Sequence, residues 1–317
     1  MLPVGVFLKR NHNYIALSKS RTSSSSSFKE TYFYKKLYDY SLLVKFKLTL
    51  LVVFSTIVPF IAGSEVLNWQ LVFWLGISGF LITGAANALN EVLEKDFDKL
   101  MPRTLDRPLA AGRMEVQEAV LAAGLMSLAG LSIISFFFNP LAGLVATLSL
   151  LIYAFVYTPM KRVGPIAVWI GAIPGAFPMM IGWIAATGNL GIEAWLLFSL
   201  QFFWQFPHFW AIAWVKHEDY TKGGYKLLPS NGEPDRATAL QSLFYSVMLL
   251  PLTFVAWKVE LLSTPSIGLL TLVTLHYIWS AWKLYRSCDK ADALKLMFSS
   301  FLYLPVLLFL LIADKIF

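Results

Sequence analysis

Residues 87 to 108 read NALNEVLEKDFDKLMPRTLDRP and lie between two long apolar runs. Within eight residues the stretch places four acidic side chains, at Glu91, Glu94, Asp96 and Asp98. Two arginines follow, at Arg103 and Arg107. The chain has 317 residues, 57% of them hydrophobic and only 14% charged, whereas soluble domains are about a quarter charged. This composition predicts a membrane protein that gathers its charges at a few points outside the apolar runs.

Nine apolar runs are long enough to cross the hydrocarbon core, which takes about 20 mostly apolar residues per helix. They cover approximately residues 42–62, 69–90, 116–138, 140–159, 165–187, 191–215, 237–257, 264–285 and 296–313. None alternates polar and apolar residues as a barrel strand does, and a helix pairs its own backbone groups in lipid. We therefore predict an all-α, polytopic membrane protein with nine transmembrane helices.

The basic residues indicate which ends of these helices face the cytoplasm. With nine spans, 24 of the 26 Lys and Arg residues fall on the side of the N-terminal tail, and only Lys258 and Lys315 fall on the other. The positive-inside rule places the first side in the cytoplasm, or in the equivalent compartment of an organelle. The net charge of +7 suits anionic lipid or an anionic substrate, and the sequence contains no nucleic-acid-binding pattern.

Residues 1–40 differ from the rest of the chain, because they are basic and Ser-rich and contain no acidic residue before Glu30. We interpret them as a disordered cytoplasmic tail that lies against anionic headgroups, although the same composition is typical of an organellar transit peptide. Residues 41–317 then form a single membrane domain. A bacterial inner membrane is the favoured location, ahead of the mitochondrial inner membrane.

Asn90, Glu94 and Asp98 recur every four residues, so a helix that continues past the membrane boundary carries all three on one face. Like charges repel at this spacing, and the arrangement becomes favourable around a divalent cation. Carboxylate and amide oxygens suit Mg²⁺, which binds one or two carboxylates together with substrate phosphates. Asp96 points to another side of the helix. The sequence therefore indicates a Mg²⁺ site at the cytoplasmic rim.

Basic residues near this face are candidates for binding a diphosphate. Arg103, Arg107 and Arg113 follow in the same loop, and an Arg side chain matches phosphate oxygens with two parallel hydrogen bonds. Lys161 and Arg162, at the end of the fourth run, either add charge to the same site or reach lipid headgroups. The opposing interpretation is a solvated loop whose charges pair among themselves.

A second charged loop follows an aromatic segment, WQFPHFWAIAW, that begins at Trp204. Pro207 kinks this helix, and His208 beside it either packs through hydrogen bonds or contacts a flat substrate. Glu218 and Asp219 begin the loop itself. A second carboxylate pair opposite the first would complete a two-metal clamp on one diphosphate.

These motifs together resemble those of the UbiA superfamily of intramembrane prenyltransferases. The first motif is Asn90-x-x-x-Glu94-x-x-x-Asp98 followed by RTLDRPLAAGR. Three more, YTPMKR, WQFPHFWAIAW and DYTKGGYKLLP, resemble the heme-farnesylating branch of the superfamily, and the likeness covers about residues 40–315. It implies nine helices around a central cavity that the two cytoplasmic loops close. It also implies that Mg²⁺ and diphosphate are bound by Asn90, Glu94, Asp98 and Asp219.

The resemblance further implies a reaction. Farnesyl diphosphate is the expected donor and a vinyl group of heme b the expected acceptor, and added water gives heme O for terminal oxidases. Heme b is then a substrate and not a prosthetic group, with Trp204 and His208 as candidates for its pocket. The expectation extends to a handover of the product to heme A synthase or to terminal oxidase assembly. Two residues depart from the family pattern, which mostly has Asp at Glu94 and a second Asp at Gly223, so a second metal site stays open.

Other functions remain compatible with the residues themselves. A related prenyltransferase would act on an aromatic acid, a quinone precursor or a chlorophyll. A non-catalytic heme-handling membrane protein would use His208 as an axial ligand and would have no use for the acidic face. A transporter would place ionisable groups near the middle of the membrane, where the first five runs have almost none.

Overall fold

The computed structural model describes residues 24–230 and 232–316. Its helices are α1 (Ser24–Leu43), α2 (Phe46–Gly63), α3 (Trp69–Asp98), α4 (Val116–Phe137), α5 (Pro140–Leu151), the π-helix η1 (Ile152–Tyr157), α6 (Thr158–Met160), α7 (Ile166–Thr187), α8 (Ile192–Val215), α9 (His217–Lys222), α10 (Arg236–Val247), α11 (Leu249–Lys258), α12 (Thr264–Ser287) and α13 (Lys290–Ile316). These ranges contain no strand, which confirms the predicted all-α class.

The chain divides into two compact units, Met1–Tyr38 and Asp39–Phe317, and the second contains helices α2 to α13. Residues 24–43 form helix α1, where the sequence predicts an irregular tail as far as residue 40. Residues 1–23 lie outside the described part of the chain, so disorder there stays a prediction.

Seven helical stretches are long and apolar enough to cross a membrane, among the residues that the structure describes. They are α2, α3, α4, the continuous run from α5 to α6, α7, the run from α10 to α11, and α13. Helices α8 and α12 have 24 residues each, but polar side chains such as Gln201, Gln205 and His276 reduce their hydropathy. The membrane protein is confirmed, and the count of nine spans is not.

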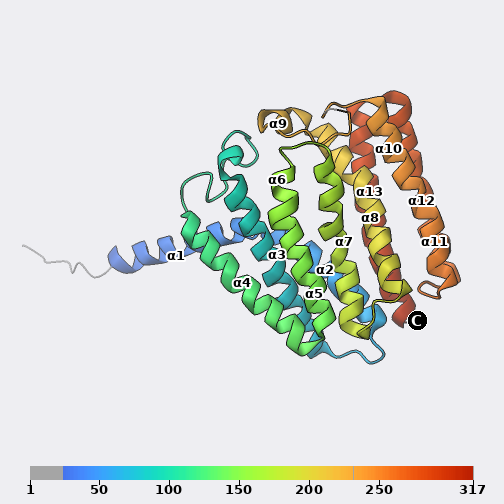
Figure 1. Cartoon of the computed structure of the whole chain (residues 1–317), viewed down its shortest axis with the longest axis horizontal. Coiled ribbons are helices and arrows are strands. Elements are labelled where there is room, and N and C mark those ends of the chain that lie inside the picture. Colours follow the sequence, from blue (N-terminus) through green and yellow to red (C-terminus); the bar gives the residue numbers. More distant parts are fainter. Residues whose placement is uncertain (1–23, 231, 317) are drawn as a thin grey trace, which may run out of the picture. The chain divides into compact units, whose positions relative to one another are not determined.

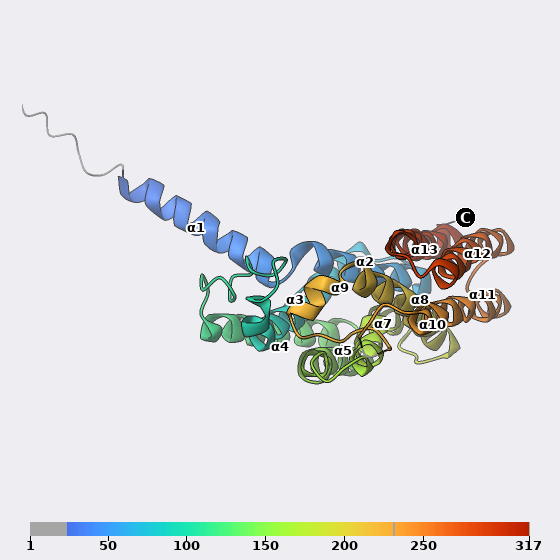
Figure 2. The ribbon, with the colours of Figure 1, turned by 90° about the horizontal axis from the view of Figure 1, so that it is seen from above.

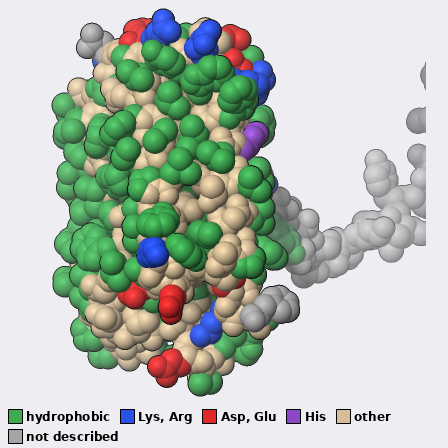
Figure 3. All heavy atoms as spheres, turned by 90° about the vertical axis from the view of Figure 1, so that its right-hand side faces the viewer, with side chains coloured by type: hydrophobic (Ala, Val, Ile, Leu, Met, Phe, Trp, Pro, Cys, Tyr) green, Lys and Arg blue, Asp and Glu red, His purple; other side chains and the backbone are tan. Residues whose placement is uncertain are grey.

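A small apolar cluster around Phe206 and Tyr245 joins α7, α8 and α10, and two large clusters hold the helices of the second unit side by side. One joins α2 to α5 and α7 through buried residues such as Leu75, Ala123 and Ile184, and the other joins α8 to α10–α13 through residues such as Leu200 and Tyr303. Helix α2 packs against α3, α7 and α13 and so connects the two halves (Figure 2). Figure 3 shows a face covered by hydrophobic side chains, with charged groups gathered toward its two ends. Such a belt suits contact with lipid.

The long connections lie together at one end of these helices, and the C-terminus lies at the other (Figure 1). Helix α3 continues to Asp98 and holds the following loop by hydrogen bonds at two points. The backbone N–H of Leu109 donates to Glu91 Oε1 over 3.2 Å, and the Thr104 hydroxyl donates to the Asp98 carbonyl oxygen over 2.8 Å. The loop is thereby folded back over the end of α3.

Candidate active site

Asn90, Glu94 and Asp98 lie on one face of α3, as their spacing predicts, and all three side chains are buried. They line a cavity of about 190 Å³ at the loop end of the bundle. Asp96, two residues before Asp98, is exposed and pairs with Lys99 at 3.0 Å. The structure therefore brings the three predicted metal ligands together and leaves the neighbouring carboxylate in solvent.

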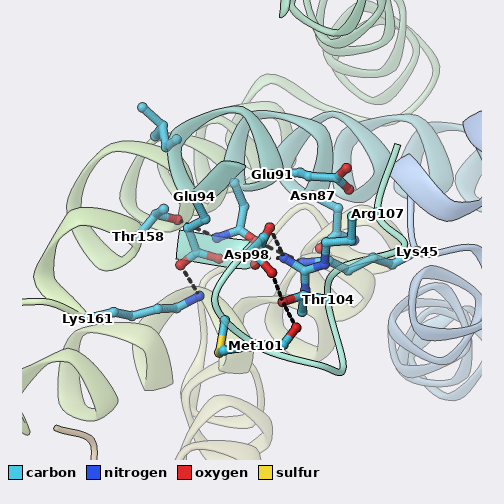
Figure 4. A network of polar contacts seen from close by, with 12 residues as sticks. Lys45, Asn87, Glu91, Glu94, Asp98, Met101, Thr104, Arg107, Thr158 and Lys161 are labelled. Atoms are coloured by element: carbon cyan, nitrogen blue, oxygen red, sulfur yellow. Dashed lines mark hydrogen bonds and ion pairs between the residues drawn. The ribbon is translucent and has the colours of Figure 1, made fainter. Parts of the chain in front are cut away.

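The two carboxylates of this cavity are paired with cations from other parts of the chain (Figure 4). Lys161 Nζ donates a hydrogen bond to Glu94 Oε1 over 2.8 Å, and the Arg107 guanidinium donates to Asp98 Oδ2 over 2.7 Å. Burial alone would lower the pKa of Arg107, but the nearby carboxylates, Asp98 first and then Glu91 and Glu94, together outweigh it and raise that pKa. Burial would likewise lower the pKa of Lys161, but that pKa is raised, chiefly because the Glu94 carboxylate lies beside the ammonium group. Both cations therefore stay charged at neutral pH.

Lys45 reaches the same cavity from the junction between α1 and α2. Its backbone is left-handed, with φ 49°, which is uncommon for a residue with a side chain. From this turn Nζ donates to Asn90 Oδ1 over 2.8 Å, while Asn90 Nδ2 donates to Thr158 Oγ1 over 3.0 Å. Burial, with Arg107 and Lys161 nearby, lowers the pKa of Lys45 to about 7. The lysine is thus held beside the predicted ligands at a cost in desolvation.

The oxygen atoms of the cavity fit a magnesium ion that is shared with a diphosphate. Asp98 Oδ1 is buried and has no hydrogen-bond partner among the described residues, so it is available as a ligand. Within the same residues, no group of three or more His, Cys, Asp or Glu side chains is placed to hold a metal ion alone. Mg²⁺ commonly takes one or two carboxylates and completes its shell with water and phosphates. Four basic and two acidic residues line the cavity, and this excess of positive charge favours a polyanion.

Two of the predicted phosphate-binding arginines are engaged elsewhere. The Arg162 guanidinium donates to the Leu93 carbonyl oxygen over 2.8 Å and lies 3.8 Å from the centre of the Phe97 ring. Arg113 pairs with Asp39 at 2.8 Å. Neither arginine lines the cavity. Both side chains instead fasten neighbouring segments to one another.

The second charged loop contributes tyrosines to the cavity where the sequence predicts a carboxylate. Tyr220 and Tyr225 line it, whereas Asp219, on α9, is not among the lining residues. Arg103 does line the cavity, as predicted, and its guanidinium lies 5.5 Å from the centre of the Tyr220 ring. The structure therefore brings Arg103 to the site and does not bring Asp219 to it.

Gly223 stands where the family pattern has a second Asp, and its surroundings are tight. A Cβ atom at this position would lie 2.8 Å from Met101 Sδ and 3.0 Å from the Tyr225 ring. Real Cβ atoms almost never approach other heavy atoms so closely, so an aspartate here would require the Met101 and Tyr225 side chains to shift. The geometry offers one acidic face, on α3.

Trp204 and His208, predicted to contact the acceptor, form a stacked pair on α8 with ring centres 4.8 Å apart. Trp204 Nε1 donates to the Ser300 carbonyl oxygen over 2.9 Å, and His208 Nδ1 lies 2.7 Å from the Ser300 hydroxyl oxygen. That hydroxyl donates its proton to the Met297 carbonyl oxygen, so it accepts from His208. The network assigns the histidine proton to Nδ1 and leaves the lone pair on Nε2. Neither ring lines the cavity around Glu94.

Sequence reasoning did not single out Lys45, Tyr157, Tyr220 or Tyr225, all of which line the cavity. Lys45 falls inside an apolar run, and an ionisable residue in such a run is a usable signal for a functional site. Tyr157 ends the π-helix η1, whose wider turn precedes Pro159, a residue that has no backbone N–H. Nothing in the letters of the sequence marks that local geometry.

A second, apolar cavity of about 120 Å³ lies between α2, α3, α5 and α7. Leu48 lines both cavities, so the two adjoin. The Tyr153 hydroxyl donates to Asn87 Oδ1 over 3.4 Å, and both side chains line the apolar cavity. A charged chamber is thus placed beside an apolar one, which suits a ligand with a polyanionic head and a hydrocarbon tail.

A membrane-embedded helical bundle with this pair of chambers suits an intramembrane enzyme that acts on an amphipathic anion, and the comparison with known families agrees. Residues 51–304 match the UbiA prenyltransferase family, and the chain belongs to this family. It is 44% identical over 280 residues to the protoheme IX farnesyltransferase of Cytophaga hutchinsonii. The matched region covers 88% of this chain and 98% of that relative. The resemblance seen in the motifs is confirmed, and the chain is a multi-pass integral membrane protein.

Solved structures show the same fold at low sequence identity. A digeranylgeranylglyceryl phosphate synthase superimposes with a TM-score of 0.76 at 18% identity, covering 89% of this chain and 99% of its own. A UbiA homolog from Archaeoglobus fulgidus bound to GPP and Mg²⁺ superimposes with a TM-score of 0.62 at 17% identity, covering 87% and 99%. The predicted UbiA-type prenyltransferase fold is therefore confirmed.

Proposed function

We propose that this chain transfers the farnesyl group of farnesyl diphosphate to a vinyl group of heme b, with addition of water, and so makes heme O. The observation that carries the proposal is the buried cavity in which Glu94 and Asp98 face Lys45, Arg107 and Lys161 beside an apolar chamber. The acceptor is taken from the relatives, which are named protoheme IX farnesyltransferase at up to 44% identity.

The charged chamber suits the departure of a diphosphate. The bond between C1 of the farnesyl chain and the diphosphate oxygen breaks, and the oxygen keeps the electron pair. Arg103, Arg107 and Lys161 would release their carboxylate or aromatic partners and neutralise the negative charge as it develops, which is electrostatic stabilisation of a leaving group. Mg²⁺, held by Asn90 and the two carboxylates, would supply further positive charge at the same oxygens.

The remaining steps use the apolar and aromatic walls. The farnesyl chain would lie along the chamber that adjoins the site at Leu48, where the hydrocarbon loses contact with water. Aromatic faces favour nearby positive charge by about 0.5–2 kcal/mol, and Tyr157 already holds the Lys161 ammonium 4.6 Å from its ring centre. The terminal vinyl carbon of heme bonds to the allylic C1, and the resulting cation takes up water and loses a proton. Trp204 and His208 are proposed to contact the macrocycle.

The membrane setting completes the proposal. The loop end of the bundle, which carries the cavity, would face the cytoplasm together with the N-terminus, which is supported by the concentration of basic residues in these segments. A bacterial inner membrane suits the bacterial relatives. The product would pass to heme A synthase or to terminal oxidase assembly.

The direct test is an acceptor screen with the purified full chain, farnesyl diphosphate and Mg²⁺. We expect heme b to gain the mass of one farnesyl group and one hydroxyl group, because the added water loses a proton, and mass analysis of the porphyrin detects this gain. Aromatic acids, quinone precursors and chlorophylls serve as parallel acceptors. Modification of one of these with heme unchanged would establish the related prenyltransferase instead. A heme spectrum without diphosphate release would indicate a heme-handling protein.

Lys161→Gln is expected to raise the KM for farnesyl diphosphate about tenfold or more. The Lys161 ammonium lies in the cavity on Glu94, and a hydrogen bond to a charged group is worth about 1.5–3 kcal/mol. Arg162→Gln is the matched control, because the neighbouring cation is engaged outside the cavity. Steady-state kinetics on both variants check the assignment. Equal effects of the two substitutions would mean that Lys161 does not contact the substrate.

A further inference from the structure

A groove of about 430 Å³ lies between α12 and α13 and shares no residue with the cavity around Glu94. Its lining combines one ionisable ring, aromatic and polar side chains, and two lysines, namely His276, Trp279, Lys283, Lys295, Phe298 and Ser299. Trp279 is 51% exposed and Phe298 is 59% exposed, so flat apolar surfaces are presented outward. Exposed aromatic surface in a groove favours a flat apolar ligand.

His276 is the least expected member of this lining. It lies near the middle of α12, is exposed, and stands among residues such as Leu272, Leu275 and Trp279 that are also exposed and apolar. An ionisable side chain in such surroundings is a candidate for function. Imidazole is also the commonest metal ligand among side chains. The site therefore offers a metal-binding atom within an apolar wall.

The two lysines lie toward the end of the groove that carries the cytoplasmic loops. Lys283 follows His276 by seven residues, which places it two helical turns, or about 10.5 Å, further along nearly the same face of α12. Its ammonium lies 5.3 Å from the centre of the Trp279 ring. Lys295 pairs with Asp292 at 2.8 Å on the surface of α13. The Lys295 side chain is 65% exposed, so water screens this pair and the lysine is available to a different anion.

We propose that this groove binds the iron porphyrin acceptor on its way to the active site, with the iron at His276 and the two propionates at Lys283 and Lys295. The inference rests on the proposed function, because it takes heme b as the acceptor. A porphyrin of this type has its metal at the centre and both carboxylates on one edge. The groove has the same order along its length, a metal ligand followed by a pair of cations.

The charge and shape of the groove favour this occupant over an anionic phospholipid. A phosphate headgroup would use the lysines, but its acyl chains would have no use for the imidazole of His276. A flat ring would lie against Trp279 and Phe298, where offset aromatic contacts are favourable. All of these features are met by a single rigid ligand.

The groove is also next to the pocket proposed for the acceptor. Ser299 lines the groove, and the following residue, Ser300, contacts Trp204 and His208. Consecutive residues of a helix point about 100° apart, so α13 presents one face to the groove and the next to the stacked pair. A porphyrin held at the groove is thus separated from that pair by the width of one helix.

The test is a binding titration with the full chain in nanodiscs of zwitterionic lipid, without farnesyl diphosphate. Iron protoporphyrin IX, metal-free protoporphyrin IX and its dimethyl ester serve as probes. His276→Gln should weaken binding of the iron porphyrin about tenfold and shift its Soret band, while the metal-free porphyrin binds as before. The double variant Lys283→Gln, Lys295→Gln should weaken both free acids about tenfold, as expected for lost charged hydrogen bonds, and should leave the ester unaffected. In turnover assays both variants should raise the KM for heme.

Lys258→Gln is the control, because this lysine lies at the opposite end of the bundle, on α11. Unchanged binding of the iron porphyrin in both groove variants would overturn the proposal. Recovery of porphyrin binding by the double-lysine variant on addition of phosphatidylglycerol would overturn it as well. Failure of the proposed function is recognised separately, because no farnesylated porphyrin would then form even where the wild-type protein binds heme. Elution profiles and thermal midpoints exclude unfolding of the variants.

Discussion

Asp98→Asn is expected to reduce turnover by about 100- to 1,000-fold while the protein stays folded. The Asp98 carboxylate lies in the cavity, holds Arg107 at 2.7 Å through Oδ2, and leaves Oδ1 buried and available for a ligand. Asparagine keeps the shape of the side chain and removes its charge. Loss of one preorganised electrostatic group at a site of developing charge costs a factor of this size. Single-turnover measurements of diphosphate release give the readout.

Asp96→Asn is the matched control for this substitution. The substitution makes the same chemical change two residues away on the same helix. The Asp96 side chain, however, is exposed and pairs with Lys99. We expect turnover within about twofold of the wild type, since exposed pairs contribute little. A similar loss in both variants would assign the effect to the charge of the region and not to the cavity.

The acidic face was predictable because it depends only on the period of a helix. Asn90, Glu94 and Asp98 recur every four residues, and any helix that continues to residue 98 must carry them on one side. Arg107 and Lys161 were predictable as cations near that face. The sequence could not show, however, that Lys161 and not its neighbour Arg162 enters the cavity. The side chain that enters depends on the conformation of the turn before residue 165.

The rest of the cavity depends on geometry that the sequence does not state. Lys45 reaches Asn90 only because the chain makes a left-handed turn between α1 and α2, inside a run that looks like uninterrupted helix. Tyr220 lines the cavity while the adjacent Asp219 does not, since a short helix, α9, sets which neighbour faces inward. His276 is an ionisable residue inside an apolar run, but the sequence does not show that α13 places Lys295 in the same groove.

Gly182→Ala is expected to destabilise the fold more than an alanine at any of the other glycines within the helices of the bundle. Gly182 lies where α7 crosses α2, and a Cβ atom built there would overlap the Thr56 carbonyl oxygen and lie 3.2 Å from the Phe60 nitrogen. Both obstacles are backbone atoms, so a side-chain rotation cannot relieve the contact, and the two helices must separate. Overpacking of this kind costs about 1–3 kcal/mol or more. Small residues permit such close helix contacts in membranes.

Gly124→Ala makes the same chemical change and is expected to leave the stability of the fold unchanged or to raise it. Gly124 lies inside α4, and a Cβ atom there would meet no heavy atom within 4 Å. Alanine in an open helical position is favoured over glycine by about 0.5–1 kcal/mol, so the thermal midpoint in detergent should stay level or rise, while that of Gly182→Ala should fall. Because α2 also packs against α3 and carries Lys45 at its start, separation of α2 from α7 should weaken substrate binding as well. Equal midpoints for the two variants would show that the α2–α7 contact is not as close as the structure has it.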